Sequence, residues 1–160
     1  MGSYRQIGLV VRDLEKTMEQ WWTVLGVGPW NVKHQTADSI SEFQVDGQPV
    51  SEDFDLYVAS AWVGEIQFEL IQPIKGPNIF WRHLESKGEG LHHVKQVVSD
   101  DELPGTLAKF AERGYNVIES GRVVENLHYF LDTEDDLGFI LEVGNAGKGS
   151  PPDRIYPPAD

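Results

Sequence analysis

The chain has 160 residues, of which 26 are acidic and 13 basic, so its formal net charge is -13. So acidic a protein repels a phosphate backbone, and we expect no nucleic-acid partner. The 40% hydrophobic content is typical of a folded globular protein, and no apolar run is long enough for a membrane span or resembles a signal peptide. We therefore expect a cytoplasmic protein with no membrane partner.

The absence of cysteine limits the metal chemistry that the chain can support. With no Cys in the sequence, neither a disulfide nor a thiolate metal site can form. Any metal must be held by His, Glu, Asp, Gln or Asn, which suit divalent Zn, Ni, Co, Mn, Fe or Mg.

Two stretches begin with the same strand-then-helix pattern. Residues 6–11 (QIGLVV) are apolar and β-branched, and Asp13 is a candidate N-cap for a helix that Gly26 ends. Residues 93–98 (HVKQVV) predict a second strand, followed by a helix that Gly114 ends. The pattern indicates an internal repeat.

The ends of the two copies also match. Residues 64–71 (GEIQFELI) and 137–144 (LGFILEVG) both lead from a glycine turn into a strand with a central glutamate. The first strands are offset by 93 − 6 = 87 residues and the glutamates by 142 − 69 = 73, so the first copy carries 87 − 73 = 14 extra residues. We place them in the polar residues 36–55, which predict a long hairpin loop.

The repeat predicts an α+β protein organised as one domain. We expect a first βαβββ module in residues 1–76, a linking helix in 77–90 and a second βαβββ module in 91–144. Residues 145–160 contain four prolines and cannot continue a sheet or helix. This tail should be extended and lie on the surface or on a second subunit.

Two glutamates lie in strongly apolar strands. Glu69 stands between Phe68 and Leu70, and Glu142 is flanked by apolar residues in the same way. A carboxylate in such a strand needs a cation or a hydrogen-bond donor if it is buried. One glutamate alone could instead face solvent on a half-exposed sheet. Two at matching repeat positions favour a shared partner.

The first strands contribute two more candidate ligands at matching positions. Gln6 and His93 would lie beside Glu69 and Glu142 if both modules share one concave face. Four N and O donors with an open position make a competent metal site. A lone strand histidine, by contrast, is more often a hydrogen-bonded core residue. The four residues together predict the metal site.

Three long runs resemble one known superfamily, the vicinal oxygen chelate proteins, which include glyoxalases, bleomycin resistance proteins and methylmalonyl-CoA epimerases. They are residues 6–30, 69–94 and 129–143, so the resemblance covers nearly the whole chain to about Gly144. Residues 89–93 (EGLHH) are especially similar to methylmalonyl-CoA epimerases, in which the second histidine of the pair ligates the metal.

The resemblance implies a glyoxalase-like fold, in which two βαβββ modules form a cupped mixed β-sheet. It implies the metal ligands Gln6, Glu69, His93 and Glu142, and leaves His92 as a neighbour without an assigned role. The usual first ligand of the family is His. Gln6 stands in its place, as in some glyoxalase I enzymes, and its amide oxygen is a weaker donor.

The ligand set favours Lewis-acid chemistry over oxygen activation. One imidazole, one amide and two carboxylates do not match the two-His, one-carboxylate triad of O₂-activating enzymes. We expect a metal-dependent isomerase or lyase that transfers a proton next to a substrate carbonyl through an enediolate-type intermediate. Glu142 is the first candidate base and Glu69 the second. The acid partner stays open between Glu42 and Glu52.

The substrate is less defined. Val10 and Glu89 stand where glyoxalase I commonly has arginines, which argues against a glutathione adduct. Many aromatic side chains could line an apolar cup, and His128, Tyr129 and Asp132 are candidate pocket residues that could equally be strand surface.

Two alternatives remain at this point. The chain could be a non-catalytic binding protein that sequesters an apolar or aromatic small molecule, or a biosynthetic enzyme for a larger carbonyl compound. The expected partners are a small-molecule carbonyl substrate and a second copy of the chain in a homodimer.

Overall fold

The strands form one open mixed sheet. The computed structural model describes residues 2–159, so Met1 of the first expected module and Asp160 of the expected tail lie outside it. The order across the sheet is β11-β2-β5-β6-β1-β7-β10-β9-β8-β3-β4. The strands are β1 (Ser3–Val10), β2 (Trp30–Thr36), β3 (Ser41–Val45), β4 (Gln48–Pro49), β5 (Asp55–Val63), β6 (Ile66–Lys75), β7 (Gly90–Val97), β8 (Val117–Val123), β9 (Asn126–Leu131), β10 (Ile140–Gly144) and β11 (Arg154–Tyr156).

The helices begin and end where the local sequence directs. Asp13 caps the first helix by accepting a hydrogen bond from the Lys16 N–H at 3.0 Å, and Gly26 ends it in the left-handed region at φ +68°. The helical elements are α1 (Leu14–Gln20), the π-helix η1 (Trp21–Leu25), the 3₁₀ turn η2 (Ala37–Ser39), α2 (Ile79–Lys87), α3 (Leu103–Glu112) and α4 (Glu134–Leu137). No helix in residues 2–159 is long and apolar enough to cross a membrane.

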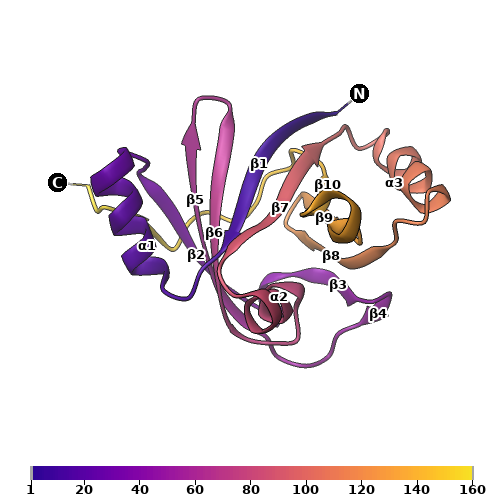
Figure 1. Cartoon of the computed structure of the whole chain (residues 1–160), viewed down its shortest axis with the longest axis horizontal. Helices are drawn as coiled ribbons and strands as arrows, with labels where there is room; N and C mark the ends of the chain where they lie inside the picture. Colours follow the sequence, from indigo (N-terminus) through magenta and orange to yellow (C-terminus); the bar gives the residue numbers. More distant parts are fainter. Residues whose placement is uncertain (1, 160) are drawn as a thin grey trace.

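The chain folds as two βαβββ modules, as the repeat predicts. In the first, β1 and α1 precede β2, β5 and β6, and in the second, β7 and α3 precede β8, β9 and β10. The first and last strands of each module pair in parallel, whereas β1 and β7 pair antiparallel at the centre. The two halves therefore join along β1 and β7, and their outer strands curl toward each other (Figure 1).

The insertion in the first module is not the hairpin loop expected for residues 36–55. It contains η2, β3 and β4, and β3 pairs antiparallel with β8 of the second module. Phe43 and Val45 of β3 are buried in the core with Phe54, which packs against the Phe43 ring at 4.8 Å between centroids. Burial of these alternating apolar side chains stabilises strand over loop. The first half thus supplies edge strands to the second.

Three apolar clusters hold the sheet and helices together. One packs α1 against the outer face of the first module around Met18 and Trp30, and a second packs α3 against the second module around Leu141. The third lies on the inner face of the curved sheet and includes Phe80 of α2 and Phe130 of β9. The inner cluster places an apolar wall beside the central strands.

The proline-rich tail follows the edge of its own chain. Its strand β11 pairs antiparallel with β2. The Asp153 carboxylate accepts a hydrogen bond from the His34 N–H at 2.7 Å, and the Asp153 N–H donates to the Val32 carbonyl at 2.9 Å. The tail therefore covers the open edge of the first module.

Candidate functional site

The four predicted ligands meet at one point, on the four central strands of the sheet. His93 Nε2 lies 3.3 Å from Gln6 Oε1 and 3.3 Å from Glu69 Oε2. The same nitrogen atom is also 3.3 Å from Glu142 Oε2. The side chains come from β1, β6, β7 and β10, so each module contributes its first and last strand. The structure brings all four residues together.

Strand register explains this convergence. Gly8 of β1 is the Cα partner of Glu69 on β6 and of His93 on β7. The His93 imidazole lies directly over Gly8, where an added Cβ would overlap the ring. A side chain at this position would therefore displace the imidazole that forms the centre of the site.

The donors, and their distances from His93 Nε2, suit a divalent ion. A single imidazole nitrogen faces three oxygens at 3.3 Å and can donate to only one of them at a time. Tetrahedral ligands at about 2.0–2.1 Å from a metal lie about 3.3–3.4 Å from one another. Residues 2–159 contain no group of three or more His, Cys, Asp or Glu side chains already arranged to hold an ion. The assignment therefore rests on the convergence at His93 Nε2 and on the chemistry of the donors.

His92 provides a partner for the other nitrogen of His93. The two Nδ1 atoms lie 3.0 Å apart, and both rings are fully buried. Burial, followed by the charges of His93 and His83, holds the pKa of His92 well below its usual value, so His92 is neutral. If His93 donates from Nδ1, its Nε2 presents a lone pair to the cluster, as a metal ligand must.

Lys95 is a site residue that the sequence analysis missed. It lies two residues after His93 on β7, so its side chain points to the same face. Its Nζ is 3.0 Å from Glu142 Oε1, and the residue is only 6% exposed. Counting alternate residues from His93 would have placed it here.

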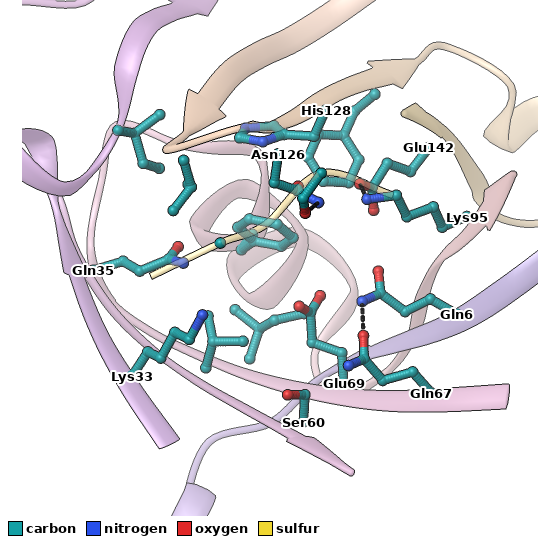
Figure 2. Close-up of a pocket in the computed structure, with 18 of the residues that line it drawn as sticks. Gln6, Lys33, Gln35, Ser60, Gln67, Glu69, Lys95, Asn126, His128 and Glu142 are labelled. Atoms are coloured by element: carbon teal, nitrogen blue, oxygen red, sulfur yellow. Dashed lines mark hydrogen bonds and ion pairs between the residues drawn. The ribbon is translucent and has the colours of Figure 1, made fainter. Parts of the chain in front are cut away.

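A second missed residue orients Gln6. The Gln6 Nε2 donates to Gln67 Oε1 at 2.6 Å (Figure 2). This hydrogen bond turns Gln6 Oε1 toward His93 Nε2, 3.3 Å away. Gln6 and Gln67 are register partners on neighbouring strands. Gln67 thus fixes which end of the amide faces the cluster.

The two carboxylates of the cluster have different surroundings. Burial would raise the pKa of Glu142, but Lys95, His93 and His128 together outweigh it and hold the pKa below its usual value. Glu142 Oε1 faces Lys95 and Oε2 faces His93. Glu69 has a side chain that is 20% exposed, and among residues 2–159 its Oε1 forms no hydrogen bond or ion pair.

A cavity of about 670 Å³ opens in front of the cluster. Its polar wall includes Gln6, Lys33, Gln35, Ser60, Gln67, Glu69, Lys95, Asn126, His128 and Glu142 (Figure 2). Its apolar wall includes Phe43, Phe54, Leu56, Val58, Phe80 and Phe130. This size and this mixture of polar and apolar walls are typical of small-molecule sites.

The structure separates the other candidate pocket residues. His128 lines the cavity, and burial lowers its pKa to about 4, so its imidazole is neutral. Tyr129 and Asp132 do not line it. Glu42 pairs with Arg122 at 3.4 Å on the surface, and exposed Glu52 does not line the cavity either. The two acid partners left open by the sequence therefore both lie outside this pocket.

Glu119 of β8 is another cavity residue that the sequence analysis missed. Its carboxyl accepts a hydrogen bond from the Ile79 N–H at the start of α2, at 3.1 Å. Burial raises its pKa to about 8, against the lowering effects of that hydrogen bond and of Arg82. Glu119 is therefore largely protonated at neutral pH and adds no full charge to the cavity.

Solved structures share this fold at low sequence identity. A methylmalonyl-CoA epimerase from Mycobacterium tuberculosis has a TM-score of 0.64 and 19% identity over 94% of this chain and 89% of the other. A Streptomyces coelicolor methylmalonyl-CoA epimerase variant in complex with 2-nitronate-propionyl-CoA has a TM-score of 0.69 and 19% identity over 94% and 99%. A hypothetical protein from Bacillus halodurans C-125 has a TM-score of 0.64 and 16% identity over 93% and 97%.

Sequence comparison identifies the family. No curated protein matches the chain at a significant level. A family profile, described as the Glyoxalase/Bleomycin resistance protein/Dioxygenase superfamily, matches residues 5–131. This match spans more than half of the chain and confirms the resemblance found in its sequence. The chain belongs to the Glyoxalase/Bleomycin resistance protein/Dioxygenase superfamily.

Proposed function

We propose that the protein is a metal-dependent isomerase or lyase that transfers a proton next to the carbonyl of a small-molecule substrate. The observation that carries the proposal is the convergence of three oxygens on His93 Nε2 at the wall of a cavity. Gln6, Glu69, His93 and Glu142 would hold the ion. A bound divalent cation would supply Lewis-acid polarisation of the substrate carbonyl.

A carboxylate of the cluster would move the proton. It takes the proton from the carbon next to the carbonyl, and the electrons of the broken C–H bond pass into the carbonyl group to give an enolate, which is an enediolate where that carbon carries a hydroxyl group. Protonation of the same carbon on its opposite face by a water molecule, with the carboxylate giving its proton back to solvent, gives an epimer. Return of the proton by the carboxylate to the neighbouring carbon gives an isomer. Each outcome conserves atoms and electrons without a further reactant other than water.

Glu69 has the geometry better suited to this role. Its Oε1 is unpaired among the described residues, whereas both oxygens of Glu142 have partners at 3.0 and 3.3 Å. The sequence ranks Glu142 first and Glu69 second as the base. We reverse that order here, so that Glu142 becomes the second candidate. In either case the carboxylate lies beside the ion position, close to the carbon from which the proton leaves.

Several features restrict the substrate. The cavity of about 670 Å³ admits a small molecule, and the apolar wall favours a substrate with a hydrocarbon part beside its carbonyl. Solved methylmalonyl-CoA epimerases are in complex with methylmalonyl-CoA or 2-nitronate-propionyl-CoA, so an acyl-CoA belongs in the test set. Glutathione adducts are disfavoured because Val10 and Glu89 replace the expected arginines.

The test measures solvent exchange at the reacting carbon. Protein loaded with Zn²⁺, Ni²⁺, Co²⁺ or Mg²⁺ is incubated in heavy water with acyl-CoA, α-keto and 2-hydroxyketone compounds, and deuterium incorporation is followed by NMR. We expect exchange with at least one compound class. Glu69→Gln should slow it about 100-fold or more, because the general base is removed, while Glu142→Gln should mainly weaken metal binding.

Glu65→Gln is the matched control, since Glu65 is exposed in the turn between β5 and β6 and should keep full exchange. If metal-loaded protein exchanges no deuterium with any compound of the set, proton transfer next to a carbonyl is the wrong reaction. If Glu142→Gln alone abolishes exchange at full metal occupancy, the two carboxylates have the opposite roles.

A second candidate function is sequestration of an apolar or aromatic small molecule. The observation that favours it is the cluster of four phenylalanines, Phe43, Phe54, Phe80 and Phe130, along one wall of the cavity. Treatment with EDTA separates the two functions. A binding protein keeps its affinity for a fluorescent aromatic probe after metal removal, whereas the proposed enzyme loses its exchange activity.

A further inference from the structure

The cluster contains a cation of its own, the ammonium group of Lys95. The side chain extends from β7 toward Glu142 in the cavity wall (Figure 2). Its Nζ lies 3.0 Å from Glu142 Oε1, and the other carboxylate oxygen, Oε2, faces His93. Lys95 is 6% exposed and Glu142 is 4% exposed, so water screens this pair weakly.

The fold makes room for this lysine. Lys95 and Glu142 are register partners on β7 and β10. Gly144 follows on the same face of β10, and a Cβ there would overlap the backbone carbonyl of Leu127 and would lie 3.1 Å from Lys95 Cε and 3.3 Å from Lys95 Nζ. The absence of a side chain at Gly144 leaves the space in which the lysine lies against Glu142.

Charge counting shows what the lysine does to the cluster. Glu69 and Glu142 bring two negative charges to His93, and Lys95 cancels one of them. His128, the other titratable group facing this pair, is neutral because burial lowers its pKa to about 4. Lys33, which also lines the cavity, interacts electrostatically with Glu69. A divalent ion at the cluster would therefore meet less negative charge than the two carboxylates carry alone, and would lie close to the fixed positive charge of Lys95.

We propose that Lys95 is a built-in counter-cation that competes with the divalent ion for Glu142 and so sets a low metal affinity for this site. The inference rests on the proposed function in one respect only, which is that the ion is held by Gln6, Glu69, His93 and Glu142. With no metal bound, the ammonium keeps the buried Glu142 carboxylate paired. With metal bound, the Lys95 ammonium and the divalent ion repel each other, and this repulsion weakens metal binding more strongly the closer the two charges lie.

The experiment compares metal affinity across charge variants by titration calorimetry with Co²⁺ and Zn²⁺ alone. Lys95→Met removes the charge and keeps much of the volume, and we expect it to bind metal about tenfold more tightly or more. Lys95→Arg keeps the charge and should stay within about threefold of the unmodified chain. Lys109→Met is the control, because Lys109 is an exposed lysine of α3 that does not line the cavity.

A second readout needs no metal. Lys95→Met leaves Glu142 buried without its partner, so the melting temperature of the metal-free variant should fall and should be restored by Co²⁺. If Met at this position prevents folding, Lys95→Gln replaces it. In a Glu142→Gln background, Lys95→Met should tighten metal binding less than it does in the unmodified chain, because the pair is already broken.

Each result decides the inference. Tighter metal binding by Lys95→Met supports the inference. If the unmodified chain binds no metal while the variant does, the inference stands and the metal-dependent part of the proposed function fails. Equal or weaker binding by the variant, with binding by the unmodified chain, overturns the inference and leaves the proposed function standing. Absence of binding in both overturns both.

Discussion

The absence of a side chain at Gly8 of β1 determines where the central imidazole of His93 lies. Gly8 faces the His93 ring, and any larger residue would push the ring out of its place between Gln6 and the two carboxylates. Gly8 lies in a regular strand and does not have a positive φ, so its need for glycine is one of space and not of backbone conformation.

Gly8→Ala should therefore weaken metal binding about 10- to 100-fold, comparable to the loss of a group that orients a ligand. Titration calorimetry with Zn²⁺ measures the effect. Gly64→Ala is a useful control for general damage, because Gly64 lies in the β5–β6 turn with open space around it, although its φ of +60° costs some stability. Unchanged affinity in Gly8→Ala would mean that His93 is not a ligand.

The sequence predicted the four residues of the cluster but not their supporting groups. Gln6, Glu69, His93 and Glu142 could be found because internal duplication places them at matching positions. Lys95 could also have been found by strand alternation, but a lysine in a strand ordinarily predicts solvent exposure. Gln67 and Glu119 gave no such signal, since their importance depends on which strands become neighbours in the folded sheet.

At the scale of elements, Glu119 connects β8 of the second module to the start of α2. Its carboxyl accepts the Ile79 N–H in a fully buried position, with the charges of Arg82 and Asp46 nearby. Burial raises its pKa to about 8 from the ordinary value of 4.5. Because the folded state binds this proton more tightly than the unfolded state, stability is lost as pH rises between these two values.

Glu119→Gln should remove this pH dependence. The slope that Glu119 adds is at most about 1.4 kcal/mol per pH unit between pH 4.5 and 8. Thermal unfolding of both proteins at pH 5, 6.5 and 8 measures the difference, and the variant should gain stability relative to the unmodified chain as pH rises. Parallel pH profiles would show that Glu119 is ionised in the folded state. Glu85→Gln on the exposed side of α2 serves as the control.

The order of elements was more predictable than their pairing. Strand–helix periodicity and the caps at Asp13 and Gly26 gave the two modules, and these follow from local sequence. The strands β3 and β4 were missed because residues 36–55 are rich in turn formers, and β3 gains its stability from pairing with the distant strand β8. Local composition does not contain that information.

At the scale of the whole molecule, the tail protects the edge of the sheet. Strand β11 covers β2, which carries the fully buried Trp30, and Arg154 pairs with Glu15 of α1. Among the tail residues, Asn145, Ala146, Gly147 and Gly149 line the cavity, whereas residues 150–159 do not.

Deletion of residues 150–160 should therefore lower stability by about 2 kcal/mol and promote association through the uncovered β2 edge. Chemical denaturation and light scattering measure the two effects. The same scattering experiment on the unmodified chain gives its mass and tests the homodimer, which stays a prediction. A deletion variant with unchanged stability and mass would show that β11 contributes little.

The antiparallel seam between β1 and β7 has a consequence for ion selectivity. Each half of the molecule brings two of the four donors, so a small rotation of one half against the other changes most donor separations together. The size of the ion that the site accepts then depends on how rigidly the two halves are joined. Substitutions along this seam, far from any donor, should therefore shift the preference between smaller and larger cations.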